Sequence, residues 1–163
     1  MREYETVSHS FGPVFDEKSR ILILGSMPSV KSRETSFYYG HPQNRFWKVI
    51  ASVVRDEAPT SVKEKTAFLL QHHIALWDVI DRCDIIGSSD SSIKNVIPND
   101  MTAIISKSAI TKIFVNGGKA EELYNKYCYP KTGMKAVKLP STSPANAAWS
   151  AEKLIKEWQT ILT

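Results

Sequence analysis

The chain has 163 residues, 42% of them hydrophobic and 23% charged, which fits one globular domain spanning 1–163 and excludes an intrinsically disordered chain. The net charge of +4 is compatible with a phosphate-binding face, although many proteins without a nucleic-acid partner share it. Two cysteines, Cys83 and Cys128, are too few for a zinc site or an iron–sulfur cluster, and no apolar run reaches the ~18 residues of a membrane span. We therefore expect a cytoplasmic protein with two reduced thiols, no metal, no cofactor and no membrane contact.

The first predicted element is a β-strand over Arg20–Leu24. Residues 21–24 are apolar at consecutive positions, which is typical of a strand buried on both faces in a parallel sheet. Apolar residues at helical spacing then predict one helix across 46–54 and a second across 62–70. A further run of mostly apolar residues predicts the second strand at Ile74–Val79.

The third predicted strand, Lys112–Val115, is followed after a glycine-rich opening by a helix across 120–127. The fourth strand, Lys135–Leu139, precedes an amphipathic helix at Leu154–Leu162. Strands and helices that alternate, joined by right-handed crossovers, predict a three-layer α/β/α sandwich around a short parallel four-stranded sheet.

In a sheet of this kind the ligand binds beyond the carboxyl ends of the strands. The site is therefore expected among the segments that follow the four strands: Gly25–Asn44, Asp78–Asn95, Asn116–Ala120 and Pro140–Asn146.

Three stretches in these segments carry unusual combinations of residues. Gly25-Ser26-Met27-Pro28-Ser29 joins a glycine that permits a sharp turn to a stiffening proline, which predicts a rigid loop, although a plain strand-to-loop turn also fits. Tyr38-Tyr39-Gly40-His41-Pro42-Gln43-Asn44-Arg45-Phe46-Trp47 leads through a His-Pro turn into an aromatic helix. The third stretch places Ser and Thr hydroxyls next to two prolines: Leu139-Pro140-Ser141-Thr142-Ser143-Pro144-Ala145-Asn146. Such a segment suits contact with phosphates or insertion into a duplex.

Taken together, these stretches resemble the uracil-DNA glycosylase superfamily, whose members carry a Gly-x-x-Pro-Gly motif after the first strand and a Pro/Ser wedge loop after the last. The sequence from 41 to 50 is similar to a segment of mismatch-specific uracil-DNA glycosylases. The sequences at 25–28, 76–79, 90–93 and 141–146 are more similar to the hypoxanthine-DNA glycosylase branch.

The resemblance spans nearly the whole chain and implies a uracil-DNA glycosylase-like fold in one domain. It implies a monofunctional hydrolase, expected to be a monomer, that cleaves the N-glycosidic bond of a flipped base in base excision repair. Its partner would be DNA containing a deaminated base, with hypoxanthine favoured. The alternatives are a uracil- or mismatch-specific glycosylase of the same superfamily and a catalytically degenerate module that only binds DNA lesions.

The resemblance also implies roles for single residues. Met27 stands where many members carry an Asn or Asp that positions the attacking water, and Ser141 stands where uracil-specific relatives carry a His. The catalytic role is therefore assigned to Asn44, with helix capping as the alternative. His41 is expected to shape the turn, and Ser29 replaces the usual glycine of the first motif.

The remaining site residues are predicted to hold the base or the DNA. Tyr39 is expected to stack on the flipped base, with core packing as the alternative. Asp78 is expected to read the base edge, with a turn cap or a pair with Arg82 as the alternative. Ser26, Met27 and Ser141 complete the predicted base-binding set, and the wedge is predicted to comprise Ser143, Pro144, Ala145 and Asn146, unless that segment is only a proline-rich connector.

Overall fold

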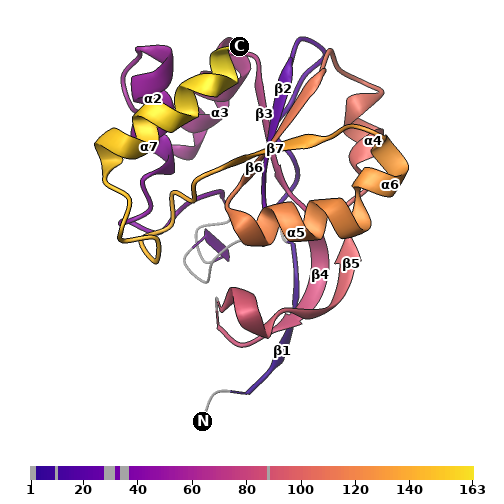
Figure 1. Cartoon of the computed structure of the whole chain (residues 1–163). Coiled ribbons are helices and arrows are strands. Elements are labelled where there is room, and N and C mark those ends of the chain that lie inside the picture. Colours follow the sequence, from indigo (N-terminus) through magenta and orange to yellow (C-terminus); the bar gives the residue numbers. More distant parts are fainter. Residues whose placement is uncertain (1–2, 10, 28–31, 34–36, 88) are drawn as a thin grey trace.

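The computed structural model of the chain describes residues 3–9, 11–27, 32–33, 37–87 and 89–163. A four-stranded parallel sheet lies at its centre, with the strand order β3–β2–β6–β7 (Figure 1). Its strands are β2 (Ile21–Gly25), β3 (Ile74–Asp78), β6 (Lys112–Asn116) and β7 (Ala136–Leu139). The predicted fold class is confirmed, and the four predicted strands agree with the observed ones to within one residue at each end.

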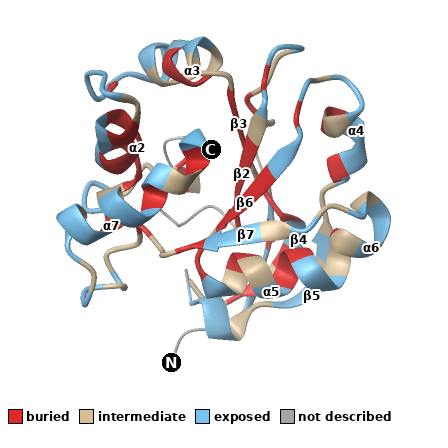
Figure 2. Ribbon diagram, turned by 45° about the horizontal axis from the view of Figure 1, so that its top comes forward, coloured by how far each residue is buried: buried red, intermediate tan, exposed pale blue. Residues whose placement is uncertain are grey.

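Strand β2 shows why the sheet needs apolar residues at consecutive positions. Leu22 and Leu24 pack into the core cluster on one face of the sheet, and Ile23 packs into the cluster on the other; all three are fully buried. Figure 2 shows buried residues concentrated along the central strands and on the helix faces turned toward them. The sheet is therefore the middle layer of the sandwich.

Helices cover both faces of this sheet (Figure 1). The helices that bury side chains in the Ile23 cluster are α2 (Phe46–Val54), α3 (Val62–Gln71) and α7 (Ala151–Trp158), which continues into the 3₁₀ helix η2 (Gln159–Leu162). The opposite cluster receives side chains from α4 (Met101–Ile105) and α5 (Gly118–Tyr127), and the short α6 (Tyr129–Thr132) follows α5.

Helix α7 ties the C-terminal part of the chain to the loop after β7. Its first turn is capped by the Ser150 hydroxyl, which accepts from Lys153 N at 3.2 Å. At its end the buried indole of Trp158 donates to the carbonyl oxygen of Pro140 at 2.9 Å. The start of the loop at 140–146 is thereby anchored to the core.

A second, antiparallel sheet was not predicted from the sequence. It has the order β1–β4–β5 and consists of β1 (Glu5–Ser8), β4 (Ile80–Ile85) and β5 (Lys94–Pro98), with the 3₁₀ helix η1 (Asp90–Ser92) before β5. Within the segment Asp78–Asn95, for which no strand was predicted beyond Val79, residues 80–85 form β4 and β5 begins at Lys94. Only Val79 separates β3 from β4, so the chain passes directly from one sheet into the other.

Within the described ranges, no helix is both long and apolar enough to cross a membrane.

Candidate functional site

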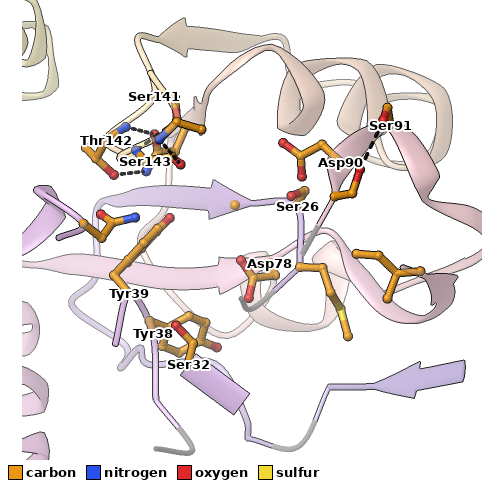
Figure 3. A pocket seen from close by; sticks show the side chains of 17 residues that line it. Ser26, Ser32, Tyr38, Tyr39, Asp78, Asp90, Ser91, Ser141, Thr142 and Ser143 are labelled. Atoms are coloured by element: carbon orange, nitrogen blue, oxygen red, sulfur yellow. Dashed lines mark hydrogen bonds between the residues drawn. The ribbon is translucent and has the colours of Figure 1, made fainter. Parts of the chain in front are cut away.

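A cavity of about 460 Å³ lies at the carboxyl ends of the parallel strands, where the fold predicts a ligand site (Figure 3). It is walled by the ends of β2, β3 and β6, by the loops after β2 and β7, and by the segment between β4 and β5. The residues that line it are Gly25, Ser26, Met27, Ser32, Tyr38, Tyr39, Asn44, Asp78, Ile85, Ser89, Asp90, Ser91, Asn116, Ser141, Thr142, Ser143 and Ala145.

Most of the predicted site residues meet in this one cavity. Pro144 and Asn146 belong to the same loop as Ser141 but lie outside the lining. Pro28 and Ser29, which the first motif includes, lie outside the described residues. The structure therefore brings residues of all three unusual stretches together in one cavity.

Asn44 lies at the cavity, one residue before Arg45, the N-cap of α2. It lines the cavity, and its side-chain Oδ1 accepts a hydrogen bond from Phe46 N at 2.9 Å at the start of α2. A carbonyl oxygen has a second lone pair, so Asn44 Oδ1 can accept from Phe46 N and still meet a ligand or water. His41 shapes the turn before it: its carbonyl oxygen accepts from Asn44 N and its Nδ1 from Gln43 N.

Tyr39 is held between the cavity and the core. Its ring stacks on Phe46, with centroids 4.1 Å apart and an angle of 21° between the planes, so that a ligand can meet only the opposite face or the edge. Its φ of 53° lies in the left-handed region, a strained conformation that is often found at functional sites. Burial and the nearby Asp78 charge raise the pKa of the Tyr39 hydroxyl, so it stays protonated at neutral pH.

Asp78 forms its buried contact with His9, which was not among the predicted site residues. His9 Nε2 lies 2.8 Å from Asp78 Oδ2, and the side chains are 2% and 5% exposed. Arg82, which was considered as a partner, is exposed on β4 instead. A Cβ atom at Gly25 would lie 2.5 Å from Asp78 Oδ1 and 3.1 Å from the Tyr39 hydroxyl oxygen, so only glycine leaves room for the carboxylate there.

The loop at 140–146 contains the four predicted wedge residues and is called the wedge loop below. Its turns are held by hydrogen bonds in which its own serine hydroxyl oxygens accept. Ser141 Oγ accepts from Ser143 N at 3.1 Å, and Ser143 Oγ accepts from Ala145 N at 3.1 Å. Asn146 Nδ2 donates to Ser141 O at 3.0 Å. The serine oxygens therefore stabilise two turns, and their O–H groups remain available as donors.

Arg45 clamps this loop from the start of α2. Its guanidinium donates to three main-chain oxygens, those of Ser143, Asn146 and Trp149. Its backbone N–H also donates to Thr142 O at 3.1 Å. Because Asn44 is the preceding residue, the clamp fixes the wedge loop relative to the predicted catalytic amide.

Asp90 forms part of the wall opposite the tyrosines and was missed as a site residue. Figure 3 shows its carboxyl directed toward Ser26. Although the residue as a whole is exposed, desolvation of the carboxyl raises the pKa of Asp90, and the Lys119 charge and the nearby Ser26 hydroxyl lower it in part. The resemblance at 90–93 was the available signal, but it carried no role for this carboxyl.

The lining is rich in hydroxyl and amide groups, and its two carboxyls are those of Asp78 and Asp90. Among the described residues, no three His, Cys, Asp or Glu side chains gather as ligands for a metal ion. The arrangement suits a planar ligand with several hydrogen-bonding groups, held between an aromatic ring and polar loops.

Comparison with known proteins gives consistent similarities. The sequence model of the uracil DNA glycosylase superfamily matches residues 13–162. A protein from Methanosarcina acetivorans named hypoxanthine DNA glycosylase is 34% identical over 159 residues, which cover 95% of this chain and 98% of that protein. One of the same name from Methanosarcina barkeri is 32% identical over 115 residues, or 70% of this chain and 73% of that protein.

The fold is similar to a solved structure as well. A candidate uracil DNA glycosylase from Methanosarcina acetivorans, determined by solution NMR, superposes with a TM-score of 0.78 at 31% sequence identity. The match covers 94% of this chain and 97% of the other.

Proposed function

The chain belongs to the uracil DNA glycosylase superfamily, and we propose that it is a monofunctional DNA glycosylase that removes hypoxanthine from DNA in base excision repair. The observation that carries this proposal is the cavity at the strand ends, in which Asn44, Tyr39 and Asp78 face one space beside the wedge loop. Relatives named hypoxanthine DNA glycosylase support the choice of base.

The target base must leave the duplex before it can reach this cavity, at a cost of about a few kcal/mol. The free face of Tyr39 can stack on the extruded base, which contributes roughly 1–3 kcal/mol without reading its identity. The Phe46 ring behind Tyr39 holds that face in place. Wedge residues Ser143, Pro144, Ala145 and Asn146 would lie against the vacated position of the duplex.

Cleavage of the N-glycosidic bond develops positive charge on the sugar and negative charge on the leaving base. A neutral amide cannot act as a strong base, so Asn44 would orient the attacking water through the second lone pair of Oδ1. Donors that are already in place stabilise the charge on the base, and the O–H groups of Ser141 and Ser143 are suitable donors. Met27 offers no group that could replace Asn44 in this role.

Asp78 and the loop at Ser26 and Met27 would read the base. An ionised carboxylate accepts hydrogen bonds but donates none, so Asp78 suits the N1–H group of hypoxanthine. We also propose that residues 1–163 act as one domain, as a monomer and in the cytoplasm, on DNA that contains a deaminated base.

Base release from otherwise identical duplexes tests the proposal. Each duplex carries one hypoxanthine, uracil, xanthine or ethenocytosine, and the reactions contain EDTA. We expect hypoxanthine to be released fastest, an intact abasic site as the product, and no covalent adduct on treatment with borohydride.

Other outcomes would favour the alternatives. Faster release of uracil would assign the chain to uracil- or mismatch-specific repair. Tight binding to every lesion without release of any base would indicate a module that only binds lesions. Activity that is lost in EDTA and restored by a divalent ion would contradict hydrolysis without a metal.

A further inference from the structure

His9 contacts Asp78 from the N-terminal segment, outside the part of the chain that the superfamily model matches. Its Nε2 lies 2.8 Å from Asp78 Oδ2, although the two residues are 69 positions apart in the chain. The imidazole lies outside the cavity lining but contacts two residues of it, Asp78 through a hydrogen bond and Tyr38 through ring packing. The hydrogen bond is the contact through which His9 can set the orientation of a polar group at the cavity.

The surroundings leave His9 little freedom to turn. Its backbone N–H donates to Asp81 O at 2.6 Å, next to the pairing of β1 with β4. Its ring packs against Phe11, with centroids 4.6 Å apart, and against Tyr38, at 5.7 Å. Tyr38 is in turn fixed by its hydroxyl, which donates to Gly12 O at 2.7 Å.

The two ring nitrogens of His9 have different surroundings. Nδ1 is buried and has no hydrogen-bond partner among the described residues, whereas Nε2 faces Asp78. A carboxylate oxygen accepts and does not donate, so in this hydrogen bond His9 Nε2–H donates to Asp78 Oδ2.

With Oδ2 occupied by His9, Asp78 Oδ1 is the oxygen left for a ligand. It lies beside Gly25 and the Tyr39 hydroxyl, and both of these residues line the cavity. An ionised carboxylate oxygen accepts but does not donate. The floor of the cavity therefore presents one acceptor in a fixed position.

This acceptor is complementary to the ring nitrogen that gains a hydrogen when the base is deaminated. Adenine N1 and cytosine N3 are bare acceptors, but the corresponding atoms of hypoxanthine and uracil carry a hydrogen. We infer that His9 is a positioning residue for base selection, because it holds Asp78 Oδ1 as an acceptor for that N–H and so disfavours the undamaged base. The inference deepens the proposed function and depends on it.

Variants of His9 separate this role from simple packing. His9→Leu removes the donor at similar size, and His9→Gln supplies an amide N–H. His9→Glu has the length of Gln but, when ionised, cannot donate. His72→Leu is the matched control, because His72 Nε2 contacts Asp56 Oδ2 at 2.9 Å in an exposed pair that lies away from the cavity.

The measurement is the single-turnover rate of hypoxanthine release with enzyme in excess, together with the melting temperature of each variant. We expect His9→Leu to lower the rate by about tenfold or more, the effect of losing one hydrogen bond to a charged group. His9→Gln should recover most of the rate, His9→Glu should not, and His72→Leu should match the parent.

A double-mutant cycle with Asp78→Ala shows whether His9 acts through Asp78. If it does, His9→Leu combined with Asp78→Ala releases hypoxanthine no more slowly than Asp78→Ala alone. Effects that multiply, or a folded His9→Leu protein with the parental rate, would overturn the inference. If His9→Leu does not fold, equal rates for the Gln and Glu variants would overturn it instead. Failure of the parent to release any base would count against the proposed function itself.

Discussion

Asn116, at the end of β6, holds Thr142 of the wedge loop with both ends of its side-chain amide. Asn116 Oδ1 accepts from Thr142 N at 3.1 Å, and Asn116 Nδ2 donates to Thr142 Oγ1 at 3.0 Å. Thr142 is fully buried, so water cannot replace either bond without a change in structure. The wedge loop is therefore fixed directly to the end of β6.

Asn116→Ala should loosen this loop and destabilise the protein. Two buried polar groups of Thr142 lose their partner, and each such group costs about 1–3 kcal/mol when left unsatisfied. We expect a lower melting temperature and weaker binding to a hypoxanthine duplex. Asn125→Ala, at an exposed position of α5, is the control and should melt like the parent. Equal melting of both variants would show that the loop holds without the Asn116 amide.

The parallel sheet could be predicted because its strands have a strong local signal. In β2 and β6 the core residues follow one another without a polar break, since both faces of the sheet are covered. The antiparallel sheet has no such signal. Strand β4 carries Asp81, Arg82 and Asp84, and its register with β5 shifts twice, so the two-residue alternation that marks a half-buried strand is lost.

The site was predictable in part for a related reason. Tyr39 and Asn44 lie in the unusual stretch 38–47 of the segment that follows β2, and Asp78 ends β3, so the fold places all three where a ligand is expected. His9 and Asn116 have no local pattern that points to their partners. Their contacts arise only when segments far apart in the chain meet, and sequence spacing carries no information on such contacts.

Gly25 should tolerate no side chain. The added Cβ of Gly25→Ala would lie 2.5 Å from Asp78 Oδ1. Either the Asp78 carboxylate or strand β2 would then have to shift. We expect a loss of about 1–3 kcal/mol, as for overpacking elsewhere, and slower hypoxanthine release. Gly118→Ala is the control, because its Cβ meets nothing within 4 Å at the start of α5. Chemical denaturation of both variants measures the difference, and equal stability would contradict the crowding of Asp78.

Asn44 should matter for both stability and chemistry. Asn44→Ala removes the acceptor for Phe46 N and is expected to cost about 0.5–1.5 kcal/mol, as for the loss of one hydrogen bond. Base release should fall by about 10²-fold or more, the range for losing one positioned catalytic group. Asn44→Asp keeps an acceptor for Phe46 N and for water, so it should be more stable and more active than Asn44→Ala.

Single-turnover release and melting curves for the two Asn44 variants separate these effects. DNA affinity should change little in Asn44→Ala, because a neutral side chain leaves the phosphate contacts intact. A folded Asn44→Ala protein that releases the base at the parental rate would remove Asn44 from the chemical step. His41 would then be the next residue to consider.

Asp78→Asn should alter which base the cavity accepts, because His9 decides how the new amide lies. If His9 Nε2–H donates, the amide oxygen must face His9 and the amide nitrogen must face the cavity. The acceptor on the cavity floor then becomes a donor, which opposes the N1–H of hypoxanthine. The rate of uracil release is expected to fall less. The N3–H of uracil is flanked by two carbonyl oxygens, either of which can accept from the amide, whereas the N1–H of hypoxanthine has only one carbonyl oxygen beside it.

The expected result is a fall in hypoxanthine release of about tenfold or more, with a smaller fall for uracil, so that the ratio of the two rates shifts toward uracil. Asp78→Ala should impair hypoxanthine release without this shift, because it removes the acceptor and supplies no donor. Both rates are measured on duplexes that differ only in the lesion, with the melting temperatures as the measure of folding. Rates that fall by the same factor for both bases in both variants would make Asp78 a structural residue. The backbone groups of Ser26 and Met27 would then have to read the base.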